Sequence, residues 1–131
     1  MNKSVVDSEI ALAFEAIKNT GIAEGQEKNK VNKAFRGQIS SFGAAVTTGS
    51  LLAAVTFFSK QGEASVDRSK LLATIFEVLT GDNKLDKNKY SCLFDYVKAN
   101  QNNPQCKENI LNASIAVKLA MNLFELTKWG D

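Results

Sequence analysis

The sequence contains no histidine, and this absence excludes several kinds of active site. Without an imidazole there is no Ser-His or Cys-His nucleophile pair, no histidine-ligated metal and no histidine acting as general acid or base. The two cysteines, Cys92 and Cys106, do not predict a zinc site, because they lie far apart and no second pair accompanies them. We expect both thiols to be reduced and packed in the core.

Long apolar runs and a leader-like N-terminus are also missing. Charged residues interrupt the first stretch, MNKSVVDSEIALAF, so we expect neither a signal peptide nor a membrane anchor. No run approaches the roughly 20 apolar residues that a membrane span requires. These absences predict a cytoplasmic protein with no membrane contact.

Proline is nearly absent, and its scarcity favours helices. A single proline accompanies recurrent Ala, Leu, Lys and Glu, which lose little on entering a helix. The length of 131 residues suits one domain with a real core and is too short for two of ordinary size. We therefore expect an all-α fold, a compact single-domain bundle of about six helices with short loops that occupies residues 1–131.

Apolar residues at spacings of three and four place these helices along the chain. They are expected at Lys3 to Asn19, Asn29 to Thr47, 51 to 58, Val66 to Thr80, Asp86 to Asn100, and about Pro104 to Lys128. The polar segments 22–29 and 61–65 should be loops, and Trp129 should cover the core. No strand pattern of comparable strength is present.

Local signals predict how some of these helices begin. Gly49 is free to take a positive φ at the corner before the LLAAVTFF helix, and Ser50 or Thr48 can cap that helix. Asn103 precedes Pro104, which combines a favoured cap residue with proline at the first helical position.

One stretch lacks acidic residues, although the formal net charge of the whole chain is only +2. Residues 28–60 contain no Asp or Glu and carry the cations Lys28, Lys30, Lys33, Arg36 and Lys60. On a helical wheel, Lys30, Lys33, Arg36 and Ser40 lie opposite an apolar arc formed by Val31, Ala34, Phe35, Ile39, Phe42, Ala45 and Val46. Ordinary surfaces intersperse the two signs, so this basic stripe favours phosphate contacts over a merely solvated helix face.

No stacking motif for RNA bases accompanies the basic stripe. Phe35, Phe42, Phe57 and Phe58 have the spacing of core residues. The stripe therefore predicts contacts with a nucleic-acid backbone and no sequence-specific readout.

The remaining motifs do not indicate catalysis or a cofactor. GDNKLDKNKY at 81–90 places Asp82, Asp86 and Asn88 close together, but Lys84 occupies the third ligand position of a calcium loop, and the required glycine and terminal glutamate are absent. We expect a capping loop there, with Asp86 as the cap. The acidic residues Glu9, Glu15, Glu63, Asp67 and Glu77 are spread over several elements and do not form a recognisable catalytic pair. We predict no enzyme activity and no cofactor.

Residues 28–60 resemble the signature region of the small α-helical subunit of type III-B CRISPR effector complexes, the fifth of the Cmr proteins. The likeness lies in the basic and aromatic segment Lys33-Ala34-Phe35-Arg36 and in the glycine-led apolar helix TGSLLAAVTFFSK at 48–60. The C-terminal AVKLAMNLFELTKWGD also looks like the closing helix of that family, although only Lys128-Trp129 matches its usual aromatic and basic ending.

The resemblance implies a noncatalytic protein of antiviral defence that stacks with copies of itself along other CRISPR effector subunits. Together these subunits would hold guide RNA and target RNA in a basic channel. The residues expected to bind RNA backbone are Lys30, Lys33 and Arg36, with Lys60, Arg68 and Lys70 as weaker additions. Two alternatives remain: the small subunit of a type III-A complex, and a helical protein-protein adaptor whose basic face meets an acidic partner without RNA.

Overall fold

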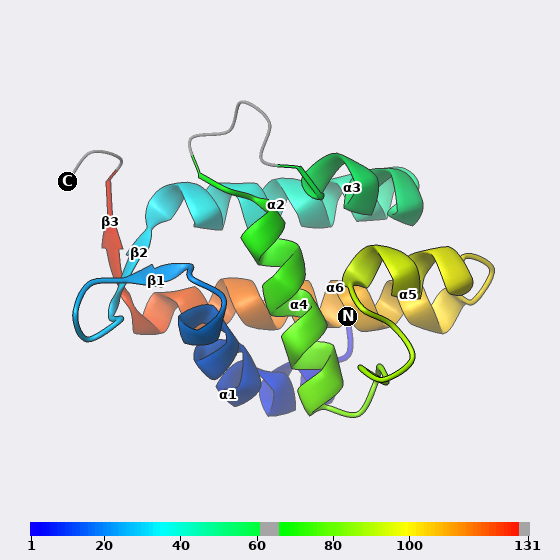
Figure 1. Ribbon diagram of the computed structural model, residues 1–131, viewed down its shortest axis with the longest axis horizontal. Coiled ribbons are helices and arrows are strands. Elements are labelled where there is room, and N and C mark those ends of the chain that lie inside the picture. Colours follow the sequence, from blue (N-terminus) through cyan, green and yellow to red (C-terminus); the bar gives the residue numbers. More distant parts are fainter. Residues whose placement is uncertain (61–65, 129–131) are drawn as a thin grey trace.

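The computed structural model describes residues 1–60 and 66–128 as helices joined to a small sheet (Figure 1). The helices are α1 (Lys3–Asn19), α2 (Lys33–Thr48), α3 (Leu51–Phe58), α4 (Ser69–Gly81), α5 (Leu93–Ala99) and α6 (Pro104–Ala120), followed by the 3₁₀ turn η1 (Met121–Leu123). The strands are β1 (Ala23–Glu24), β2 (Lys30–Asn32) and β3 (Glu125–Thr127). The chain is thus mainly helical, as predicted, but not purely so.

Helix α6 is the element on which three of the other helices pack. It contacts α1, α2 and α4, and it runs side by side with α2 in the opposite direction (Figure 1). Small residues such as Ala113, Ala116 and Ala120 are fully buried, which lets the neighbouring helices approach closely. A helix that is covered on several sides shows little amphipathic contrast, so its pattern alone does not reveal which neighbours it has.

Two aromatic pairs tie distant segments to this core. Phe42 of α2 meets Phe58 of α3 edge to face, with ring centroids 5.3 Å apart. Phe14 of α1 lies 5.0 Å from Phe124, which follows η1. The edge-to-face arrangement of Phe42 and Phe58 is one that aromatic rings prefer, whereas the rings of Phe14 and Phe124 are tilted by 30° to each other.

The predicted caps at Ser50 and Asn103 are confirmed, whereas Asp86 does not cap α5, which begins at Leu93. The Ser50 hydroxyl accepts a hydrogen bond from the Ala53 amide (3.2 Å), and the Asn103 side chain accepts one from the Gln105 amide (3.0 Å). Gly49 does not take the positive φ that it could adopt, since its φ is −134°. A Cβ there would lie 3.1 Å from the Ala45 carbonyl oxygen, so glycine suits the close approach at this corner.

The small sheet is the main departure from the predicted fold. Strand β2 pairs antiparallel with β1 and parallel with β3, so the segments before α2 and after α6 lie side by side. The predicted helix from Asn29 therefore begins only at Lys33, where the Asn32 side chain caps it. Strands of two or three residues are too short to leave a periodic pattern, and their pairing depends on a partner far away in the sequence.

The last predicted helix, about Pro104 to Lys128, is too long because its end pairs with β2 as strand β3. Helix α6 ends at Ala120, and the chain turns through η1 into β3 instead of continuing to Lys128. Met121 and Phe124 are buried as the helical pattern requires, but the Glu125 amide donates to the Asn29 carbonyl oxygen (2.8 Å). Pairing with β2 thus replaces the helical hydrogen bonds at this end.

Two further helix boundaries differ from the prediction. Helix α4 begins at Ser69 instead of Val66, and α5 begins at Leu93 instead of Asp86. Asp86 caps a single turn, in which its carbonyl oxygen accepts from the Lys89 amide (3.0 Å), and extended backbone at Cys92 interrupts the path to α5. The predicted loop at 61–65 and the predicted position of Trp129 lie outside the described residues.

Candidate nucleic-acid interface

A cavity of about 400 Å³ opens between α2, α6 and β3 and collects cations from two helices. Helix α2 contributes the cations Lys33 and Arg36 and the small residues Gly37 and Ser40. Helix α6 contributes Lys118. Lys33 is exposed, and Arg36 and Lys118 are half-buried. We call this cavity the α2–α6 groove.

The arrangement of α2 explains why these side chains meet. Residues three and four apart share a helix face, so Lys33, Arg36, Gly37 and Ser40 form one row while Phe35, Ile39 and Phe42 enter the core. The Ser40 hydroxyl donates to the Arg36 carbonyl oxygen (3.1 Å). This hydrogen bond is to the helix backbone and does not involve the Arg36 guanidinium. The Nε of Arg36 is buried and makes no hydrogen bond with the described residues.

A second cavity of about 220 Å³ extends the groove along α2 and shares Ser40 and Lys118 with the first. Its walls are small or apolar, among them Gly43, Ala44 and Ile115. Neither lining contains an Asp or Glu. The groove therefore has one sign of charge, and no cation in its lining is paired with a carboxylate in the ion pairs of residues 1–60 and 66–128.

Lys118 is the groove residue that we did not predict. It is the one charged residue between Glu108 and Glu125, in the mostly apolar second half of α6. A lone lysine on a nearly buried helix has to extend its ammonium group to solvent, so Lys118 could have been predicted to reach the surface. The sequence alone did not show that it reaches solvent beside Arg36.

The other predicted RNA-binding residues do not join Lys33 and Arg36 in the groove lining. Lys30 lies on β2 instead of the helix, opposite Glu125 of β3 in register, so a carboxylate neighbours it on the same face of the sheet. Lys60 is exposed beyond the end of α3. Lys70 donates to the Gly21 carbonyl oxygen (3.3 Å), and Arg68 lies over the ring of Phe57 (4.2 Å).

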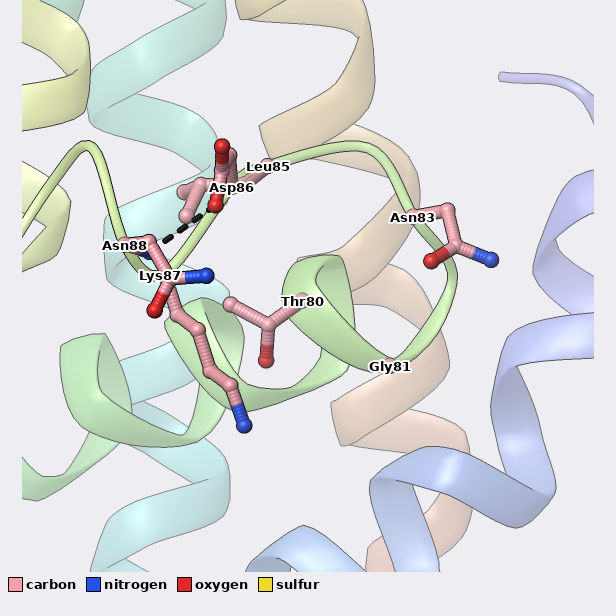
Figure 2. Close-up of a pocket in the computed structure, with 7 residues that line it drawn as sticks. All are labelled: Thr80, Gly81, Asn83, Leu85, Asp86, Lys87 and Asn88. Carbon is pink, nitrogen blue, oxygen red and sulfur yellow. Dashed lines mark hydrogen bonds between the residues drawn. The ribbon is translucent and has the colours of Figure 1, made fainter.

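A third cavity, of about 400 Å³, lies in the loop at 81–90 that was compared with a calcium site (Figure 2). Asp86 accepts a hydrogen bond from the Asn88 amide (2.9 Å), whereas Asn83 lies on the other side of the loop and points away from both. Lys87 runs along the cavity wall. Within the described part of the chain, no three His, Cys, Asp or Glu residues gather as metal ligands.

Glu9 and Asp82 form an acidic pair that the sequence did not indicate. Glu9 of α1 is fully buried, and its carboxyl oxygens accept no hydrogen bond from the described residues. In its protonated form the carboxyl group shares a hydrogen bond with the Asp82 side chain. Burial, with a smaller contribution from neighbouring Asp82, raises the pKa of Glu9 to about 8, and Lys84 acts in the opposite direction. This carboxyl group is therefore mostly protonated at neutral pH.

The prediction for the cysteines is half right. Cys106 is buried, and burial raises the pKa of its thiol. Cys92 is exposed, because it precedes the first turn of α5 in extended backbone instead of lying within a helix. Both are free thiols.

Comparisons with known proteins find no match for this chain among protein-family models, curated proteins or solved structures. In residues 1–60 and 66–128, no helix has the length and apolar character needed to cross a membrane.

Proposed function

We propose that this protein is a noncatalytic RNA-binding subunit that holds RNA backbone in the α2–α6 groove. The observation that carries the proposal is the meeting of Lys33, Arg36 and Lys118 around an open cavity without an acidic lining residue. Phosphate contacts need positive charge and access more than they need a base-reading surface. Such contacts hold RNA without preference for its sequence.

Within this proposal, the protein serves as the small subunit of a type III-B CRISPR ribonucleoprotein effector complex. The resemblance of residues 28–60 to that family supports this assignment, and the cation-lined face of α2 falls in the same segment. Guide RNA and target RNA are then the ligands, and other effector subunits and further copies of the chain are the partners. A type III-A small subunit is the nearest alternative.

The groove hypothesis is tested by binding of an arbitrary single-stranded RNA across a salt series. The test variant replaces Lys33, Arg36 and Lys118 with Gln, and the matched control replaces the exposed Lys3, Lys87 and Lys98 with Gln. Each variant loses three positive charges, so only their location differs.

For the groove variant we expect weaker binding at low salt and a slope of log affinity against log salt that is flatter by about 2, since each phosphate contact on single strands contributes roughly 0.7. The control variant should retain most of the slope. Equal losses in the two variants would show that net charge matters and the groove does not. Circular dichroism checks that both variants fold.

One feature favours the adaptor alternative. Leu119, Leu123 and Leu126 are 43%, 62% and 36% exposed, and Leu126 lines the groove. An exposed leucine in a cationic cavity, with further exposed leucines on the same C-terminal segment, suits an acidic protein partner with apolar anchors. Co-purification from cells separates the two functions: recovery of CRISPR subunits with guide RNA supports the effector assignment, and recovery of an RNA-free protein complex supports the adaptor.

A further inference from the structure

Phe57, at the end of α3, exposes an aromatic ring, although its position in the sequence pattern predicts a core residue. Phe57 is 62% exposed, whereas the adjacent Phe58 is only 3% exposed. Because the two side chains point in different directions from one helix, only Phe58 reaches the interior. The prediction that Phe57 is a core residue is therefore wrong, and a large aromatic face remains at the surface.

Arg68 is held against this ring. Its guanidinium carbon lies 4.2 Å from the Phe57 ring centroid, and its Nη2 donates to the Phe57 carbonyl oxygen (3.2 Å). Phe58 supports the pair from the inside, with its ring 5.6 Å from that of Phe57 at an interplanar angle of 68°. The cluster is thus a planar cation and a phenyl ring fixed beside each other, with little freedom left to lose on binding.

The positive charge of this cluster is not cancelled by its acidic neighbour. Asp67 directs a carboxylate oxygen to the Ser69 amide (3.1 Å) and the Ser69 hydroxyl (2.6 Å). Arg68 takes no part in the ion pairs formed among the described residues. The exposed Lys60 follows α3 by two residues and adds a second cation to this end of the helix.

We propose that Phe57 and Arg68 form a stacking site for an unpaired RNA base. The proposal rests on the proposed RNA-binding function and adds a contact of different chemistry at a second surface. Phenyl rings and guanidinium planes both stack on nucleobases, and such stacking tolerates any base because every base has a π-face. A base inside a duplex has both faces covered, so the site selects single-stranded segments.

The test compares three RNAs of equal length: a mixed-sequence single strand, the same strand with abasic residues, and a blunt duplex. Abasic RNA keeps the phosphates and lacks the stacking faces. The variants are Phe57→Leu, which keeps the apolar bulk without a planar ring, and Phe57→Tyr, which keeps the ring. The Lys33, Arg36 and Lys118 to Gln variant is the control for phosphate contacts.

We expect Phe57→Leu to weaken binding of the base-bearing single strand by about fivefold or more, with no change for abasic RNA or duplex. Phe57→Tyr should bind as the wild type does. Unchanged binding in Phe57→Leu, together with lost binding in the groove variant, would overturn the stacking site and leave the RNA function standing. Absence of RNA binding by the wild type would overturn both.

A protein contact at the same patch gives a different outcome. In that case Phe57→Leu would abolish concentration-dependent self-association, measured by sedimentation, and leave the affinities for all three RNAs unchanged. That result would overturn the stacking proposal and assign Phe57 to an interface between copies.

Discussion

The α2–α6 groove and the junction of α1 with the end of α4 each contain an ionisable side chain packed against the protein, Arg36 in the groove and Glu9 at the junction, but in opposite surroundings. The Arg36 side chain is half-buried and lines an open cavity together with Lys33 and Lys118. Glu9 is fully enclosed, and burial raises its pKa to about 8, so its charge is mostly absent at pH 7. Arginine remains protonated in proteins. Access to solvent therefore decides which of the two regions can attract a charged ligand.

The largest expected effect comes from removing the support of the groove. Phe42→Ala should lower the free energy of unfolding by about 3–5 kcal/mol, because Phe42 is fully buried and its ring anchors α2 against Phe58. Urea denaturation followed by circular dichroism measures the loss. Phe57→Ala, at an exposed position, should stay within roughly 1 kcal/mol of the wild type. Equal losses would mean that α2 is not anchored through Phe42.

The second prediction concerns the enclosed acid. The pKa of Glu9 is about 8 in the folded protein against an ordinary value of 4.5, so the folded state binds the proton more tightly than the unfolded state. The stabilising contribution of the protonated form is complete below about pH 4.5 and is lost as the pH rises through about 8. Wild-type stability should therefore fall across this range through Glu9.

Glu9→Gln removes the titrating group and should flatten that dependence. Relative to the wild type, the variant should gain roughly 1–3 kcal/mol between pH 5 and pH 8, since the folded protein no longer has to accommodate an enclosed carboxylate beside Asp82. Urea denaturation at several pH values gives the difference. A difference that stays constant with pH would show that Glu9 does not titrate in this window.

The smallest expected effect places a negative charge in the groove without disturbing the fold. A Cβ at Gly37 meets nothing within 4 Å, so a longer side chain there has open space. Gly37→Glu should weaken RNA binding about tenfold at low salt and less at high salt, because the carboxylate lies beside Arg36 and Lys33.

Gly37→Gln is the matched control, since it has the same shape without the charge. Both substitutions should raise helix stability by roughly 0.5–1 kcal/mol, as expected when glycine leaves a helix interior. Filter binding and thermal melts measure the two effects separately. If Glu and Gln weaken RNA binding equally, bulk in the groove matters and charge does not.

The helical face of α2 could be predicted because it depends on local spacing. Phe35, Ile39, Phe42 and Val46 are buried as the wheel requires, and Lys33 and Arg36 point away from them into the groove. Lys30 was misplaced because the chain enters β2 before the helix begins, and that strand forms only with partners at residues 23–24 and 125–127. A periodic pattern carries no information about such partners.

The α2–α6 groove could be predicted only in part, because its charge depends on residues from distant parts of the chain. An acid-free window in the sequence indicates a basic surface only if no acid from elsewhere folds onto it. Glu125 folds beside Lys30, whereas Lys118 folds beside Arg36. Of the cations in this window, Lys30 thus lies outside the groove, on a strand whose neighbour carries Glu125, and the groove gains Lys118 from α6.

The sequence by itself determined the helices with strong local signals, their caps at Ser50 and Asn103, and the absence of histidine chemistry. These features depend on residues a few positions apart, where propensity and spacing decide. Only the tertiary structure decided that Glu9 is enclosed near Asp82, that Phe57 is exposed under Arg68, and that Lys118 completes the groove. Burial and electrostatics depend on distance in space, and packing brings together residues that are far apart along the chain.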